Sequence, residues 1–196
     1  TKATIILSEG LLGVDYDGFI KGFKEKNKNI IVAGGLAGDN FELKKTFILL
    51  NDKIYNEGSV GVSFTSKKLY ADNRYNLNWT PIGKEFTITK SSGNIVYEID
   101  NKSSVTIFKK YLGKQIFDMD AKALPDFQLL YKEGLTIVAR TPMQRDGDAI
   151  IFAAPLKEGQ KVQFGFSNAP SVLSGSKIIK NIINKNPADA VYIFSC

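Results

Sequence analysis

Residues 85–99 read EFTITKSSGNIVYEI, and their pattern indicates the class of fold to expect. Apolar and polar residues alternate along 85–90 and again along 95–99, as they do in strands with one buried face. Between these runs, Ser91-Ser92-Gly93-Asn94 has the composition of a tight connection between antiparallel strands. The segment therefore predicts a β-hairpin.

On both sides of this hairpin the pattern predicts more strands than helices. Helices are expected after a cap at Asp15 or Asp17, from Ser103 to Gly113, and from Asn168 to Pro187. Residues 78–83 have the composition of a turn. Further strands are expected over 4–8, 30–33, 46–51, 59–65, 68–76, 135–140, 149–153, 161–166 and 191–195, with 46–51 and 59–65 forming a pair.

Consecutive strands joined by short turns favour an α+β fold, with mixed, largely antiparallel sheets and helices packed on them. Ile5–Glu9 and Tyr192–Cys196 are similar strings, which suggests a possible internal duplication. Both ends of the sequence lie in expected core strands, and its first residue is not Met. We therefore expect it to be a fragment of a longer protein.

Composition excludes several classes of site. The 196 residues contain no histidine and one cysteine, Cys196, so they offer no Ser-His or Cys-His pair, no imidazole-bound metal and no internal disulfide. The net charge of +6 comes from scattered lysines with only three arginines, which argues against nucleic-acid binding. No apolar run is long enough to span a membrane.

The glycine-rich segment after the expected strand 30–33 is the sharpest candidate for a binding site. Its glycines allow a tight turn and bring main-chain N–H groups close to a ligand. The segment matches neither the Walker loop of nucleotide-binding proteins nor the glycine fingerprint of dinucleotide-binding domains. A carboxylate and an amide follow, which suits a small polar ligand, although a purely structural turn explains the segment equally well. The candidate residues are Gly34, Gly35, Gly38, Asp39 and Asn40.

Two residues elsewhere complete the candidate site. Trp79 is the only tryptophan and could form an apolar pocket wall or a core plug. Arg140 ends an apolar strand, where its guanidinium could bind a ligand carboxylate or form a structural ion pair. No nucleophile with a base and no metal-ligand spacing can be recognised.

An ordered series of strings resembles the FIST sensory domain family. They are IILSEG, IIVAGGLAGDNF, TFILLND, GSVGVSF, WTPIG, NIVYEID and FKKYLG. The resemblance covers nearly all of the chain, with residues 1–101 as the N-terminal part and 102–196 as an incomplete C-terminal part. We also expect parts of the family's usual sequence to be missing from this chain at both ends.

The resemblance implies a non-catalytic, cytoplasmic input domain of prokaryotic signal transduction. Such domains are proposed to bind small ligands such as amino acids and to act on a histidine kinase, a chemoreceptor or a cyclic-dinucleotide enzyme. Some relatives bind haem through histidine, which this sequence lacks, so we expect no cofactor. Two alternatives stay open: an enzyme acting on a small amide or amino acid through Asp39 and lysines, or a ligand-free module that regulates a kinase.

Overall fold

The computed structural model describes residues 2–10, 14–40, 42, 44–75, 77–113, 121–134, 136–167, 169–185 and 187–194. The chain divides into two compact units. Unit 1 comprises residues 1–75 and 186–196, and unit 2 comprises residues 76–185.

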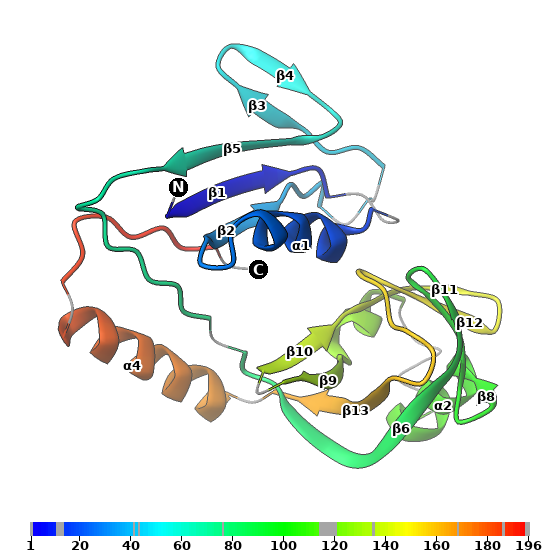
Figure 1. The fold of residues 1–196 in the computed structure, drawn as a ribbon. Coiled ribbons are helices and arrows are strands. Elements are labelled where there is room, and N and C mark those ends of the chain that lie inside the picture. Colours follow the sequence, from blue (N-terminus) through cyan, green and yellow to red (C-terminus); the bar gives the residue numbers. More distant parts are fainter. Residues whose placement is uncertain are drawn as a thin grey trace. The chain divides into compact units, whose positions relative to one another are not determined.

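Unit 1 contains a three-stranded sheet in the order β2-β1-β5. Its strands are β1 (Ala3–Ser8), β2 (Ile31–Leu36) and β5 (Ser59–Phe64). The central strand β1 pairs in parallel with β2 and antiparallel with β5. Helix α1 (Tyr16–Lys26) connects β1 to β2 (Figure 1). Its N-cap is Asp15, as predicted, and the Asp15 carboxylate accepts a hydrogen bond from the Gly18 N–H at 2.9 Å.

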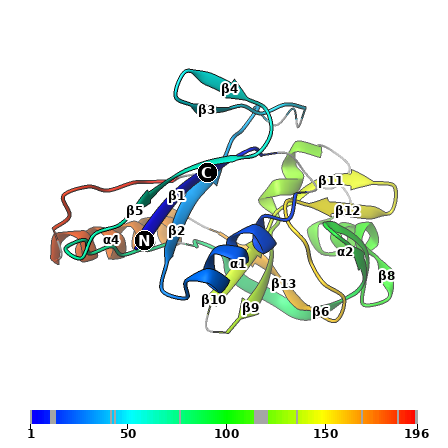
Figure 2. The same cartoon turned by 45° about the horizontal axis from the view of Figure 1, so that its top comes forward.

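A separate hairpin lies between β2 and β5. Strands β3 (Ile48–Leu50) and β4 (Lys53–Tyr55) pair only with each other among the described strands, and they stand out from the three-stranded sheet (Figures 1 and 2). The predicted pairing of 46–51 with 59–65 is therefore wrong. Residues 59–64 pair instead with the apolar strand β1, antiparallel and along its whole length.

Unit 2 is built on an eight-stranded sheet in the order β10-β9-β13-β6-β7-β12-β11, with β8 beside β7. Every pairing in it is antiparallel. The bounds are β6 (Thr80–Ser92), β7 (Ile95–Ile99), β8 (Lys102–Ser103), β9 (Leu129–Glu133), β10 (Thr136–Arg140), β11 (Pro142–Asp146), β12 (Ala149–Phe152) and β13 (Lys161–Phe166). The largely antiparallel α+β architecture is confirmed.

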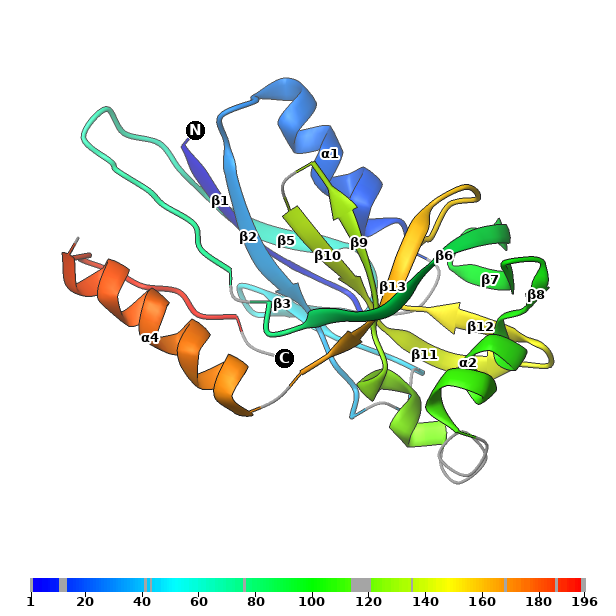
Figure 3. The ribbon, with the colours of Figure 1, turned by 90° about the horizontal axis from the view of Figure 1, so that it is seen from below.

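The sheet of unit 2 curls round its core. Strands β10 and β11 lie at its two edges, yet Thr141 alone connects them along the chain. The long strand β6 pairs with β13 through its first half and with β7 through its second (Figure 3). Side chains from the strands and from α2 (Ser104–Leu112), including Phe86, Phe108, Ile150, Phe152 and Phe164, form the core.

Local signals predicted where helix α2 begins and ends, whereas the expected cap of the last helix, Asn168, lies outside the described residues. Ser103 is the N-cap of α2, and its hydroxyl accepts a hydrogen bond from the Thr106 N–H at 3.2 Å. Gly113 follows the helix with a φ of 86°, as the sequence predicted for a helix end. A 3₁₀ helix, η1 (Ala121–Asp126), precedes β9, and α4 (Ala169–Lys185) follows β13.

The strand predictions need correction in several places. Residues 68–75 form no strand, and β11 occupies residues 142–146, for which no strand was predicted. Residues 191–194 are not a strand either, and Ser195 and Cys196 lie outside the described residues. The similarity between the two ends of the chain therefore does not extend to equal secondary structure over the described residues.

Candidate functional site

The carboxyl ends of β1 and β2 meet at one edge of the unit 1 sheet. The two strands are parallel, and their last residues, Ser8 and Leu36, are paired. The Ala37 N–H then donates to the Ser8 carbonyl at 2.8 Å, which extends the ladder by one step. In sheets with parallel strands, ligands are often bound just beyond this edge. A ligand site is therefore expected at the segments that follow Ser8 and Leu36.

Two of the candidate glycines belong to β2 and not to the loop after it. Gly34 and Gly35 pair with Ile6 and Leu7. A Cβ atom on Gly34 would lie 1.8 Å from the Ile6 carbonyl oxygen, whereas one on Gly38 would meet no atom within 4 Å. Gly34 is therefore required by close strand packing, and only the segment from Ala37 onward forms a loop.

Asp39 organises the loop that leads to β3. Its carboxylate accepts hydrogen bonds from the backbone N–H groups of Lys44 at 2.7 Å and Lys45 at 3.2 Å. Asn40 is exposed and has a φ of 59°, a left-handed conformation that asparagine tolerates. The Asp39 carboxylate thus fixes the main chain that carries the two lysines.

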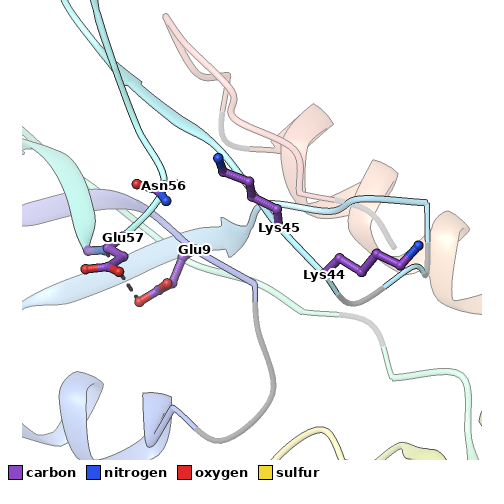
Figure 4. A pocket seen from close by; sticks show the side chains of 6 residues that line it. Glu9, Lys44, Lys45, Asn56 and Glu57 are labelled. Carbon is purple, nitrogen blue, oxygen red and sulfur yellow. Dashed lines mark hydrogen bonds between the residues drawn. The ribbon is translucent and has the colours of Figure 1, made fainter.

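A pocket of about 740 Å³ opens beside this loop (Figure 4). Three segments that are distant in sequence form it: the residue after β1, the loop before β3, and the turn between β4 and β5. Its lining residues are Glu9, Lys44, Lys45, Asn56, Glu57 and Gly58. The pocket therefore carries acidic and basic side chains at the carboxyl ends of β1 and β2.

Backbone hydrogen bonds hold Glu9 at the wall of the pocket. Its N–H donates to the Gly58 carbonyl at 3.1 Å, and its carboxylate accepts the Gly58 N–H at 3.4 Å. The Tyr16 hydroxyl donates to the Glu9 carbonyl and so connects α1 to the end of β1. Burial raises the pKa of the Tyr16 phenol, and the negative charge of Glu9 adds to that increase. Tyr16 therefore remains protonated and able to donate at neutral pH.

The predicted residues Trp79 and Arg140 belong to unit 2. Trp79 is half-buried immediately before β6, and Pro81–Gly83 lie within that strand and not in the turn expected for 78–83. Arg140 is 9% exposed and donates hydrogen bonds to the Pro155 carbonyl at 3.1 Å and to the Tyr131 hydroxyl at 2.8 Å. These bonds attach the end of β10 to its neighbours in unit 2.

Sequence reasoning did not identify the charged residues of the pocket. Glu9 precedes Lys45 by 36 positions, Lys45 precedes Glu57 by 12, and no local pattern brings the three together. One signal was available: Glu9 directly follows a buried strand, just as the loop containing Asp39 follows another. Parallel pairing of these strands would have placed the two segments side by side.

The described residues contain no group of three or more metal-ligating side chains suited to a metal ion. No helix within the described ranges is long and apolar enough to cross a membrane.

Comparison with known proteins identifies the family. Residues 1–102 match the FIST N domain, which covers more than half of the 196 residues. No curated protein and no solved structure matches the chain. The match includes β1, β2, β5 and every residue that lines the pocket. The chain belongs to the FIST family, whose domains are sensory modules associated with signal transduction.

Proposed function

We propose that this protein is a non-catalytic sensor that binds an amino acid or a similar small polar metabolite in the pocket of unit 1. The observation that carries the proposal is the pocket at the carboxyl ends of β1 and β2, which offers both signs of charge. The carboxylates of Glu9 and Glu57 suit an amino group. The amines of Lys44 and Lys45 suit a carboxylate.

The loop after β2 has a supporting part in this proposal. Asp39 is a positioning residue, because its carboxylate holds the backbone of Lys44 and Lys45. Gly34 and Gly35 keep β2 close to β1, and Gly38 and Asn40 shape the exposed loop. Trp79 and Arg140 belong to unit 2, and we do not assign them to this pocket.

Ligand binding would report to a signalling partner by a shift in population. A ligand stabilises the conformation that it binds more tightly, and the stabilised conformation changes the activity of the output protein. A cytoplasmic histidine kinase or a chemoreceptor is the kind of partner that fits a FIST sensor. Glu9 is suited to couple ligand and fold, because it lines the pocket and also contacts α1 through Tyr16.

Calorimetric titration of the whole chain with each common amino acid tests the proposal. We expect at least one to bind, with no turnover, and we expect Lys45→Met to weaken its binding about tenfold. Lys53→Met is the matched control, because Lys53 is an exposed lysine of unit 1 outside the pocket. If no small polar metabolite binds, or if Lys53→Met and Lys45→Met have equal effects, the proposal is wrong.

A further inference from the structure

We infer that α4 is an amphipathic helix that binds the surface of an anionic lipid bilayer and lies in the plane of that surface. The helix belongs to unit 2, so this inference does not depend on the pocket of unit 1. Three observations support it: an exposed apolar face, lysines at the borders of this face, and a helix sequence without acidic residues.

Four isoleucines form the apolar face of α4. They are Ile178, Ile179, Ile182 and Ile183. Successive residues of an α-helix are about 100° apart around its axis, so the four occupy an arc of about 140°. Ile178 is 61% exposed and Ile183 39%, and none of the side chains described in α4 is buried. The isoleucine face is therefore accessible to a binding partner.

The composition of α4 indicates that this face needs a partner. Serine, asparagine, glycine and proline supply seven of its 17 residues, and each of them has a lower helix propensity than alanine. The stability of such a helix comes mostly from packing of its amphipathic face and less from propensity. We therefore expect the isoleucine face to be covered in the functional state of the protein.

Charge indicates what kind of surface covers the isoleucine face. Residues 169–185 contain three lysines and no acidic residue. Around the helix axis, Lys180 lies about 60° beyond Ile183. Lys185 lies about 20° beyond Ile178, at the opposite border of the face. In the part of the chain that the structure describes, no lysine of α4 lies within 4.0 Å of a carboxylate oxygen, so their amines are available to an anionic surface.

An anionic bilayer suits this arrangement better than a second copy of the helix does. Lysines at the borders can extend their amines to the lipid headgroups while the isoleucines enter the acyl boundary. A second copy would bring like-charged borders together, with no acidic residue in either helix to offset the repulsion. Unit 2 as a whole adds to the attraction, because residues 76–185 contain 15 lysines and arginines against 10 acidic residues.

Co-sedimentation of the whole chain with lipid vesicles tests the inference. One set of vesicles contains phosphatidylcholine alone, and the other contains phosphatidylcholine and phosphatidylserine in equal parts. At low salt we expect binding to the anionic vesicles to be about tenfold tighter than binding to the neutral ones. High salt should remove most of this preference, because it screens the lysine charges.

Ile178→Asn tests the apolar face. It should weaken binding to the anionic vesicles about tenfold, because it replaces an apolar side chain of the inserted face by a polar one. Leu173→Asn is the matched control, since Leu173 is 63% exposed in the same helix but lies about 80° outside the isoleucine face. The control should bind within about twofold of the wild-type chain. Circular dichroism establishes that both variants keep the wild-type fold.

A pair of double variants tests the lysine borders. Lys180→Gln with Lys185→Gln should remove most of the preference for anionic vesicles, because both amines lie beside the inserted face. Lys132→Gln with Lys157→Gln makes the same change of charge at exposed lysines of unit 2 outside α4, and it should keep most of the preference.

The remaining outcomes overturn the inference. They are no binding to either kind of vesicle, equal binding to both kinds, and equal losses in Ile178→Asn and Leu173→Asn. Sedimentation equilibrium without lipid tests a second copy as the partner. A dimer that Ile178→Asn dissociates would show that protein and not lipid covers the isoleucine face. None of these results bears on the sensor proposal, which is tested by calorimetry with small metabolites.

Discussion

Gly34 and Gly38 belong to the same short motif, yet the structure gives them different roles. A side chain on Gly34 would collide with the Ile6 carbonyl in the neighbouring strand, whereas Gly38 faces open space. We therefore expect Gly34→Ala to lower the free energy of unfolding of unit 1 by about 2 kcal/mol or more, because β1 and β2 must separate. Hydrogen exchange of the β1 and β2 amides measures this loss.

Gly38→Ala is the matched control for Gly34→Ala. The φ of Gly38 is not in the left-handed region, and no atom lies within 4 Å of the added carbon. Its effect on the free energy of unfolding should remain within about 0.5 kcal/mol. A large loss for Gly38→Ala, or none for Gly34→Ala, would contradict the packing described here.

Single residues whose partners are near in sequence were predicted well. Asp15 and Ser103 cap their helices because each accepts a bond from an N–H three residues later. The pocket could not be predicted in this way, since Glu9 and Glu57 line the same pocket only after β1 and β5 have paired. A helix cap depends on residues a few positions apart, whereas this pocket depends on the pairing of strands that are distant in sequence.

At the scale of elements, β6 shows why composition misled the prediction. Trp79, Pro81 and Gly83 together predicted a turn, but residues 80–87 pair with β13. β7 joins β6 only from Ile88 onward, so among the described strands Pro81 has a partner on one side. A proline without an N–H fits a strand at such an unpaired edge.

The turn after β7 supports a pH prediction. The Asp100 carboxylate accepts bonds from Lys84 Nζ at 2.6 Å and from the Thr87 N–H at 2.8 Å, and these donors lower the pKa of Asp100 below its ordinary value of 3.8. The stabilisation is present above pH 3.8 and is lost as the pH falls through the lower pKa of the folded state. Urea unfolding at a series of acidic pH values, followed by Trp79 fluorescence, should show this loss.

Asp100→Asn separates the charge from the shape of the turn. Asp100 has a φ of 50°, which asparagine also tolerates, so the variant keeps the turn and removes the titrating group. We expect it to be less stable at neutral pH and to depend less on pH below 3.8. Asp146→Asn, at an exposed position of β11, is the control. An unchanged acid profile in Asp100→Asn would show that Asp100 contributes nothing to acid sensitivity.

At the scale of the whole molecule, the family match and the compact units divide the chain at different residues. The FIST N match ends at residue 102, inside β8, whereas the compact units meet at residues 75 and 76. The reason is pairing: β6 and β7 lie in the matched region but pair with β13 and β12, which lie beyond it. The predicted division into parts 1–101 and 102–196 therefore stays a prediction about the sequence. The sheet of unit 2 combines strands from both parts.

The two units differ in the size of their apolar cores. Among the described residues of unit 1, the buried hydrophobic side chains are Ile6, Ile30 and Ile48. All fourteen residues of the main core cluster belong to unit 2. Burial of apolar surface is the dominant favourable contribution to folding, so unit 2 should be the more stable of the two.

We therefore expect the chain to unfold in two steps as urea increases, with unit 1 first. Hydrogen exchange of the β1 amides reports on unit 1, and fluorescence of Trp79 reports on unit 2. Ile6→Ala should move only the first step and Ile88→Ala only the second, each by about 2–5 kcal/mol, because both side chains are buried. Coincident steps, or a variant that moves both equally, would show that the units unfold as one cooperative body.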